Sequence, residues 1–232
     1  MNDPYAFCAG FTEGKDERSL AQLAGGKQYH LVYDKVREFE ATIYHLEDLR
    51  VGASWSNYGL YELASKYVQV LFDGAGGDEL FGGYHWRYNH PTYYEVLNRT
   101  GVHDDYCVQL YCDLFPHDSL QDRLTFDANH FLQGVLLVVD RISMAHTIET
   151  RVPFLDNDLV DFCLTLPPEI NINKALLKNA FADLLPPEIL NNPKQGFSSP
   201  DWIGGDGNQA LNWATAAFEQ WQKQFENEQG FL

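Results

Sequence analysis

No hydrophobic run in this 232-residue chain is long enough to cross a bilayer, which takes about 20 mainly apolar residues. The longest run, 131–139, is interrupted by Gln133 and ended by Asp140. The N-terminus, Met1-Asn2-Asp3, also lacks the basic and apolar segments of a secretory signal. We therefore expect a soluble, cytoplasmic protein that makes no membrane contact.

Basic residues and paired cysteines are also scarce. Lysine and arginine number 16 against 33 acidic residues, and the net charge of −17 would repel a nucleic acid backbone. The four cysteines form no CxxC pair, so neither a zinc site nor a disulfide scaffold is indicated. The eight histidines show no metal-binding spacing such as HxxxH. Most of the acidity is expected on a solvated surface, and an anionic substrate would need a local cationic pocket.

The residues that are present predict an α/β fold. Hydrophobic residues make up 45% of the chain, enough for the core of a globular protein. Strands alternate with helices in the first half, which indicates crossover units and a parallel sheet flanked by helices. Strands are expected at 5–11, 29–32 and 68–72, and helices at 16–24 and 58–67. A further amphipathic helix is expected from the three- and four-residue spacing of Val32, Val36, Phe39, Ile43 and Leu46.

The second half, from about Trp86, is expected to be mostly helical, with prolines between its segments. One helix is expected at 172–185, closed by Pro186-Pro187, and another within the tail at 200–229. No internal repeat or low-complexity linker divides the chain. We therefore expect one domain over 1–232, with an α/β nucleotide-binding part at 1–85 and a helical part at 86–232.

The most informative segment is the glycine-rich loop at 73–84, which follows the apolar strand 68–72. Glycines let a backbone approach a ligand closely and turn its N–H groups inward, and a helix start after such a loop favours an anion. An acid beside that cradle, here Asp78, can hold the Mg²⁺ that accompanies nucleotide phosphates. In parallel sheets ligands bind beyond the carboxyl ends of strands, where this loop is expected.

Four blocks of the sequence resemble the asparagine synthetase family. They occur in the family's order and spacing, and the resemblance extends from about Tyr5 to beyond Trp202. The blocks are residues 70–84 (family pattern LSGEGxDELFGGY), 140–156 (DRxSMAxSxExRVPFLD), 174–181 with 185–189, and 193–197. A glycine loop alone would be weak evidence, whereas four ordered blocks resemble an ATP-dependent synthetase domain.

The resemblance implies an adenine-nucleotide α-hydrolase-like fold with ATP and Mg²⁺ as cofactors. In that family ATP activates the side-chain carboxylate of aspartate as an acyl-adenylate, and ammonia from glutamine, delivered by a glutaminase domain, then forms asparagine. Adenylation replaces a poor leaving group, oxide, with a stabilised phosphate. Charge builds up on crowded phosphates, so catalysis depends on cations and oriented N–H donors. The expected partners are these small molecules, with a homodimer as the oligomeric expectation.

Family roles can be carried over by position. Lys174 falls on the family's catalytic lysine, which stabilises developing charge, and Asp78 on a magnesium ligand. Contacts to ATP and pyrophosphate are assigned to Asp73, Gly74, Gly76, Gly77, Asp78 and Lys194. An ordinary exposed helix lysine is the alternative for Lys174, and a solvated loop lysine for Lys194. Glu149 and Arg151 either border the aspartate pocket or form a buried ion pair at a helix end.

Two departures from the family pattern bear on activity. Ala75 stands where the family has a glutamate proposed to handle ammonia's proton, and Asp73 stands where it has serine. The family's first phosphate loop, SGGxDS, and the cysteine nucleophile of its glutaminase domain do not occur here. We expect a truncated domain, or one completed by another chain, that makes no asparagine alone.

Two further functions stay open. Asp73 and Ala75 also suit an amidotransferase or ligase of the same fold that acts on another carboxylate. A non-catalytic paralogue that binds a partner through an exposed sheet edge is the other alternative.

Overall fold

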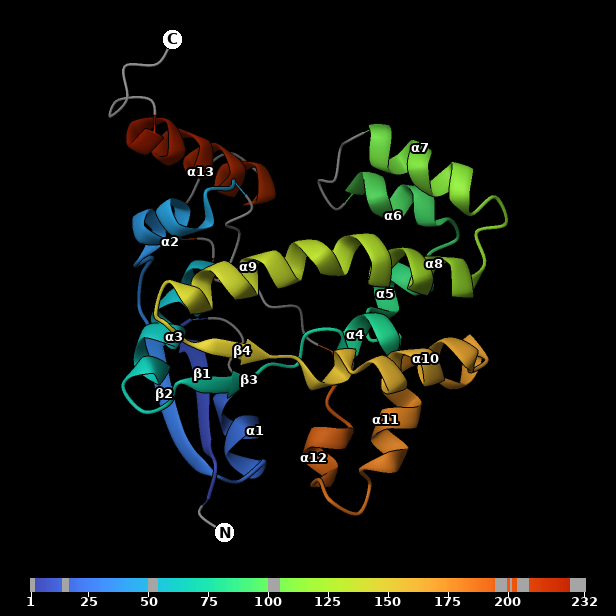
Figure 1. Ribbon diagram of the computed structural model, residues 1–232, viewed down its shortest axis with the longest axis horizontal. Helices are drawn as coiled ribbons and strands as arrows, with labels where there is room; N and C mark the ends of the chain where they lie inside the picture. The colour runs from blue at the N-terminus through green and yellow to red at the C-terminus, as the bar shows by residue number, and fades with distance from the viewer. Residues whose placement is uncertain are drawn as a thin grey trace. The chain divides into compact units, whose positions relative to one another are not determined.

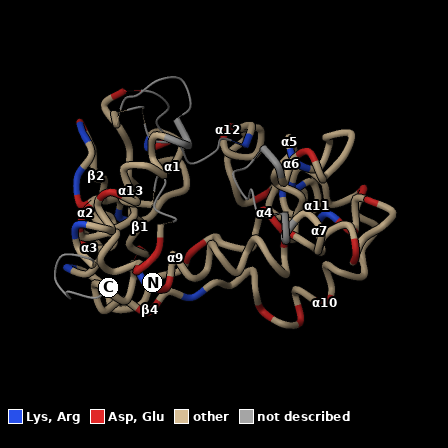
Figure 2. The backbone as a smooth tube through the Cα atoms, turned by 90° about the horizontal axis from the view of Figure 1, so that it is seen from above, with Lys and Arg blue, Asp and Glu red and all other residues tan. Residues whose placement is uncertain are grey.

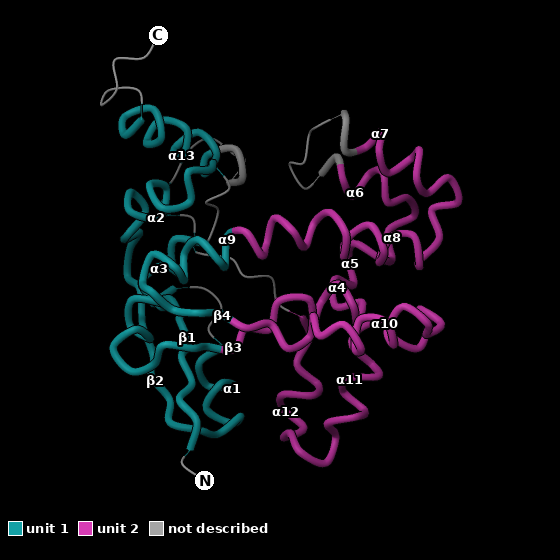
Figure 3. Tube along the Cα trace, in the orientation of Figure 1, with its two compact units in different colours: residues 1–71, 138–150, 195–232 teal, residues 72–137, 151–194 magenta. Residues whose placement is uncertain are grey.

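A computed structural model describes residues 3–13, 17–49, 54–99, 105–194, 200, 202–203 and 209–225 (Figure 1). The chain divides into two compact units, each built from separate stretches of sequence (Figure 3). The first comprises residues 1–71, 138–150 and 195–232, and the second residues 72–137 and 151–194. Within the described ranges, no helix is both long enough and apolar enough to cross a membrane.

The first unit contains a parallel pair of strands, β1 (Tyr5–Phe11) and β2 (Lys27–Tyr33). Parallel strands need a crossover connection, and α1 (Arg18–Leu23) lies in the chain between them. The predicted α/β alternation with a parallel sheet is therefore confirmed for this pair. The expected first residue of the helix, Asp16, lies outside the described residues.

Helices of the first unit supply its hydrophobic core. They are α2 (Phe39–Leu46), α3 (Trp55–Ser65) and α13 (Gln209–Phe225). Tyr33 of β2, Ile43, Trp55 and Trp213 are all buried in one cluster. Removing this apolar surface from water stabilises the unit. The helix expected in the tail is present as α13, while residues 201, 204–208 and 226–229 of that prediction lie outside the described residues.

The helix expected over 32–46 is wrong for its first part. Val32 belongs to β2, and α2 begins only at Phe39. Glu38, just before the helix, has a left-handed backbone with φ 52°, which no continuous α-helix can include. Val36 still packs partly against the core, so the helix-like spacing came from a strand, a turn and a helix that share one core.

A second short pair joins β3 (Val70–Phe72) to β4 (Glu149–Arg151). The Glu149 N–H donates to the Gln69 carbonyl at 2.9 Å, and the Asp73 N–H to the Arg151 carbonyl at 2.9 Å, a parallel pattern. The third predicted strand therefore exists. Among the residues placed by the structure it pairs with β4 rather than joining β1 and β2, so the expectation of one shared sheet is wrong there.

The second unit is mainly helical, as expected for the second half of the chain. Its helices, in chain order, are α4 (Gly77–Leu80), α5 (His85–Tyr88), α6 (Tyr93–Arg99), α7 (Asp105–Leu114), α8 (Leu120–Phe126), α10 (Asn157–Thr165), α11 (Ala175–Ala180) and α12 (Pro187–Leu190). A π-helical turn, η2 (Asp127–Phe131), leads from α8 into α9 (Leu132–Met144). One core cluster includes Tyr93, Tyr111 and Phe126, and a smaller one includes Leu80 and Phe81.

A buried ion cluster lies inside this helical unit. Asp127 is 0% exposed, and its Oδ1 lies 2.6 Å from Nη2 of Arg87, which is 2% exposed. The Tyr88 hydroxyl donates to Oδ2 at 2.9 Å, and the Tyr93 hydroxyl donates to Oδ1. Burial raises the pKa of the Asp127 carboxyl, while the guanidinium and the two hydroxyls oppose that shift. The network satisfies a charge that could not otherwise be buried.

Candidate functional site

The glycine-rich loop begins where β3 ends, as expected. Asp73 is fixed by its backbone bond to Arg151, and its side-chain Oδ1 accepts a hydrogen bond from the Ala75 N–H at 2.8 Å. This Asx-turn closes the start of the loop. The carboxylate of Asp73 therefore has a structural task that composition alone did not reveal.

The loop glycines have different surroundings. A Cβ on Gly76, whose φ is 86°, would lie 2.4 Å from Cδ2 of Leu155, and one on Gly77 would lie 3.1 Å from Cδ2 of Phe154. These two glycines let the loop pack against the 3₁₀ turn η3 (Pro153–Leu155). Gly74 is different, because a Cβ there would meet nothing within 4 Å. Of the three glycines, only Gly74 has unfilled space where a side chain would begin.

The helix after the loop, α4, is a single turn of four residues. So short a helix carries little dipole, so the expected contribution of a helix start to anion binding is not supported. Positive charge at this place must come from side chains.

Two lysines provide that charge. The Nζ of Lys174 lies 2.8 Å from Oδ1 of Asp78, and the Nζ of Lys194 donates to Oδ2 at 3.0 Å. The Asp78 side chain is 15% exposed, that of Lys174 28% and that of Lys194 37%. Two ammonium groups on one carboxylate leave a local excess of positive charge, although acidic residues are spread over both units (Figure 2). We call Asp78, Lys174 and Lys194 the lysine–aspartate cluster.

The Lys174 contact is an ion pair rather than an aligned hydrogen bond. Oδ1 of Asp78 is shielded from solvent and has no hydrogen-bond partner among the described residues, although Nζ is close enough. The pairing is electrostatic, and its geometry depends on what surrounds the carboxylate.

The segment that carries Lys174 is not the long helix expected over 172–185. A 3₁₀ turn, η5 (Ile172–Lys174), precedes α11, and the helix ends at Ala180. Asn173 and Lys174 both have φ 59°, a left-handed conformation that stops a helix from running through them. Lys174 is thus held at the start of α11 rather than on the face of a continuous helix.

Tyr84 and Glu79 line the cluster from the protein side. The sequence offered Glu79, like Asp73, only as a possible substitute for the missing acid at Ala75, and it gave Tyr84 no functional role. The Tyr84 ring lies 5.8 Å from the Lys194 ammonium, and its hydroxyl donates to Oε1 of Glu79 at 2.9 Å. Glu79 is buried, and burial raises the pKa of its carboxyl. Burial likewise raises the pKa of the Tyr84 hydroxyl. The signal for Tyr84 was its place at the end of the glycine-rich loop.

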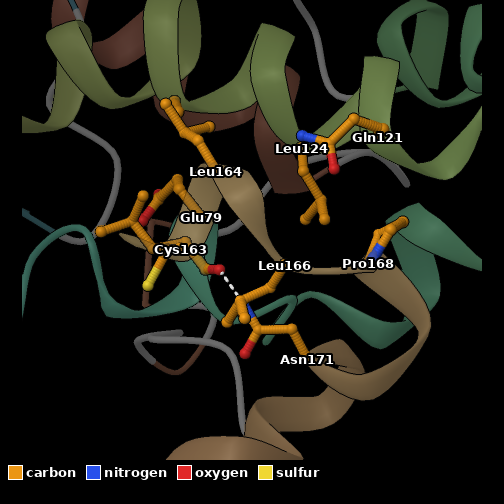
Figure 4. Close-up of a pocket in the computed structure, with 10 residues that line it drawn as sticks. Glu79, Gln121, Leu124, Cys163, Leu164, Leu166, Pro168 and Asn171 are labelled. Atoms are coloured by element: carbon orange, nitrogen blue, oxygen red, sulfur yellow. Dashed lines mark hydrogen bonds between the residues drawn. The ribbon is translucent and has the colours of Figure 1, made fainter. Parts of the chain in front are cut away.

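Glu79 and Asn171 also help to line a small pocket whose other walls are mostly apolar (Figure 4). Leu166 donates its N–H to the Cys163 carbonyl at 3.2 Å along one wall. Asn171 is buried and donates from Nδ2 to the Leu80 carbonyl. This bond ties the segment before Lys174 to the end of α4.

Glu149 and Arg151 lie in β4 rather than at a helix end. Both residues are exposed, so the alternative of a buried ion pair is wrong. The backbone of Arg151 lies beside Asp73, as described above. Residues 195–197 of the fourth block, including Gly196, lie outside the described residues.

The cluster offers one carboxylate and two ammonium groups to a ligand. In the part of the chain that the structure describes, no group of three or more His, Cys, Asp or Glu side chains could hold a metal by itself. Mg²⁺ usually binds proteins through one or two carboxylates together with substrate phosphates, and Asp78 fits such a partial donor set.

Comparison with known proteins agrees with the four sequence blocks. A profile of the asparagine synthase family matches residues 3–229. The chain is 30% identical to glutamine-hydrolysing asparagine synthetase of Rattus norvegicus over 217 residues, which cover 84% of this chain and 34% of the rat protein. It is 30% identical to the Gallus gallus enzyme (78% and 31% covered) and 29% identical to the Homo sapiens enzyme (83% and 33% covered). The chain thus spans about a third of the length of these relatives. The chain therefore belongs to the asparagine synthase family.

Proposed function

We propose that this chain supplies the ATP-dependent synthetase domain of an asparagine-forming ligase. In this proposal it adopts an adenine-nucleotide α-hydrolase-like fold, with Asp78 and the glycine loop in the nucleotide-binding part, 1–85, and both lysines in the helical part, 86–232. Aspartate is activated as an acyl-adenylate, and ammonia displaces AMP. The observation that carries the proposal is the meeting of Asp78, Lys174 and Lys194 from three separate sequence blocks.

The lysine–aspartate cluster suits the first half-reaction. Attack of a carboxylate on the α-phosphate releases pyrophosphate, so negative charge grows on oxygens that already repel one another. Lysine ammonium groups are compact, mobile point charges that can follow such oxygens. Asp78 holds both groups close together before a ligand arrives, so less reorganisation is needed when phosphate binds. Gly74 offers backbone without a side chain in the same loop.

Magnesium fits the proposal through Asp78 and the phosphates of the nucleotide. When bound, Mg²⁺ would neutralise phosphate charge. Asp78 would then share its oxygens between the cation and the two lysines. Glu149 and Arg151 stay candidates for the aspartate pocket, because their exposure leaves both side chains accessible.

Ala75 favours a second candidate, a ligase of the same fold that acts on another carboxylate. Alanine cannot transfer a proton, and general acid–base groups typically contribute about 10²–10⁴-fold. Neither neighbouring acid is well placed to substitute: Asp73 closes the loop turn, and Glu79 is buried against Tyr84. The cluster therefore supports adenylation more directly than it supports amide formation.

Exchange of labelled pyrophosphate into ATP tests the proposal, with aspartate and a panel of other carboxylic acids. The assay uses the complete protein that carries this chain, and the 232-residue chain alone in parallel. We expect aspartate-dependent exchange in the complete protein and no asparagine from the chain alone. Lys174→Ala should lower exchange by about 10²–10³-fold, the usual cost of removing a group that stabilises transition-state charge.

Lys178→Ala is the matched control, because Lys178 lies on the same helix, α11, and has no place in the cluster. It should keep exchange within about twofold of the unmodified protein. Exchange that depends on a different carboxylate would favour the second candidate. An absence of exchange with every acid tested, in a folded protein, would contradict both.

A further inference from the structure

The dipeptide Gly82-Gly83 lies directly against the segment that carries Lys174. The Lys174 N–H donates to the Phe81 carbonyl at 2.7 Å, and the Asn173 N–H donates to the Gly82 carbonyl at 2.9 Å. These bonds hold the two backbones together. A Cβ on Gly82, whose φ is 56°, would lie 2.9 Å from the Cα of Ile172. Gly82 therefore permits the approach of one backbone to the other.

Gly83 faces different atoms. A Cβ there would lie 1.9 Å from Oδ1 of Asp78 and 2.6 Å from Cε of Lys174. Its N–H donates to the Asp78 carbonyl at 2.8 Å, so the glycine cannot move away from this residue freely. The missing side chain thus leaves the space in which the Asp78 carboxylate and the Lys174 side chain meet.

The backbone around Lys174 gives the lysine little freedom to compensate. Asn173 and Lys174 both occupy the left-handed region, which is costly for residues other than glycine and persists only where the surroundings impose it. The two backbone bonds to Phe81 and Gly82 are part of those surroundings. A methyl group at position 83 would therefore be accommodated mainly by displacement of the two side chains.

We propose that Gly83 is a positioning residue, which sets the contact between the Asp78 carboxylate and the Lys174 ammonium. It does so without touching a ligand. The inference rests on the proposed function for the identity of the bound nucleotide, whereas the contact itself is a property of the chain.

The test measures how fast Lys174 reacts with acetic anhydride, followed by mass spectrometry on the full chain. An ammonium held against a carboxylate is shielded from the reagent, so Gly83→Ala should raise acetylation of Lys174 several-fold. The Tm should change little, because the atoms that must move belong to side-chain ends. Gly74→Ala is the matched control for this reading, since its methyl group would meet nothing within 4 Å and should leave Lys174 reactivity unchanged.

A double-mutant cycle separates positioning from a general packing effect. Asp78→Ala alone should also raise Lys174 reactivity, and Gly83→Ala should add nothing further in that background. If Gly83→Ala fails to fold but the double variant folds, the collision with Asp78 is confirmed. Unchanged reactivity in folded Gly83→Ala, additive effects, or failure of both variants to fold would overturn the proposal.

Enzyme kinetics on the complete protein provide a second test of the role of Gly83. Gly83→Ala should raise the KM for magnesium–ATP in the exchange assay by about tenfold, with a smaller change in kcat. An unchanged KM would overturn the proposal wherever exchange is measurable. If the unmodified protein shows no exchange, the proposed function fails, and the reactivity cycle still decides the role of Gly83.

Discussion

Two aspartates of the second unit, Asp127 and Asp78, pair with cationic side chains at very different degrees of burial. Asp127 is fully buried, and its partners are a rigid guanidinium and two tyrosine hydroxyls. Asp78 is 15% exposed, and its partners are two lysines that are more exposed than itself. In the first cluster both carboxylate oxygens of Asp127 are paired from within the protein, while the second cluster leaves excess positive charge near solvent.

The difference shows how burial separates structure from function. A buried ion pair cannot release one member without leaving the other unpaired in a low dielectric, so its partners are fixed. A partly exposed pair costs less to rearrange, because water can replace contacts of its more exposed members, here Lys174 and Lys194. On the proposed function, the lysine–aspartate cluster would exchange its internal carboxylate for a phosphate, which the Asp127 cluster could not do.

The largest expected effect comes from breaking the buried cluster. Asp127→Ala leaves the Arg87 guanidinium unpaired inside the unit and should lower the free energy of unfolding by about 3–5 kcal/mol. Urea unfolding followed by circular dichroism measures the change. The double variant Asp127→Ala/Arg87→Met should recover part of the loss, and a loss below about 1 kcal/mol in the single variant would show that the buried pair is not required.

The lysine–aspartate cluster should respond in function rather than in stability. Asp78→Asn keeps the size of the side chain and should change the free energy of unfolding by less than about 1 kcal/mol. Magnesium-dependent pyrophosphate exchange should be lost, because the carboxylate that would hold the cation is gone. Binding of pyrophosphate without magnesium, measured by calorimetry, should not weaken, since a negative charge has been removed. Weaker magnesium-free binding would contradict a metal-holding role for Asp78.

A smaller, pH-dependent effect is expected at Glu79, which follows Asp78 directly in the chain. Burial raises the pKa of its carboxyl in the folded state, so ionisation opposes folding. The penalty is absent below the unfolded-state pKa, about 4.3, and grows as pH rises through the folded-state pKa. Glu79→Gln should therefore gain stability relative to the unmodified chain as pH increases. Unfolding measured between pH 4 and 8 tests this, and parallel stability–pH curves would exclude it.

The smallest effect is expected for an exposed pair in the first unit. Arg37 lies 2.6 Å from Asp34, with side chains 43% and 59% exposed. Solvent screens this pair, so Asp34→Asn should leave the Tm unchanged within error. A measurable drop in Tm would mean that the stabilisation from an ion pair does not decrease with its exposure. That would contradict the comparison of Asp127, Asp78 and Asp34.

Local patterns predicted the strands better than the helix limits. The apolar run at 5–11 matches β1, because a strand is set by a few consecutive residues. The spacing from Val32 to Leu46 overestimated α2, since residues on different elements can face one core with a helix-like period. Glu38 carried no local sign of its left-handed backbone, and the tendency of asparagine toward that region was only a weak sign for Asn173.

Local sequence patterns also predicted only part of the candidate site. Lys174 and Lys194 stand far from Asp78 in the chain, and family resemblance rather than spacing grouped them. Their contact distances follow from folding of the second unit. The loop glycines were predicted as a ligand cradle, yet Gly76 and Gly77 also abut Leu155 and Phe154. Such packing needs the position of a distant turn, which no sequence window contains.

The division of the chain into interleaved units affects how it can be synthesised. The first unit takes its sequence from three stretches, and the last of them holds Trp213 and Ala217, which share a core with Trp55. During translation, that core stays incomplete until α13 has left the ribosome. The second unit has all of its residues by position 194 and can finish first. A nascent chain paused before α13 would therefore expose the aromatic core of the first unit, and would need protection there.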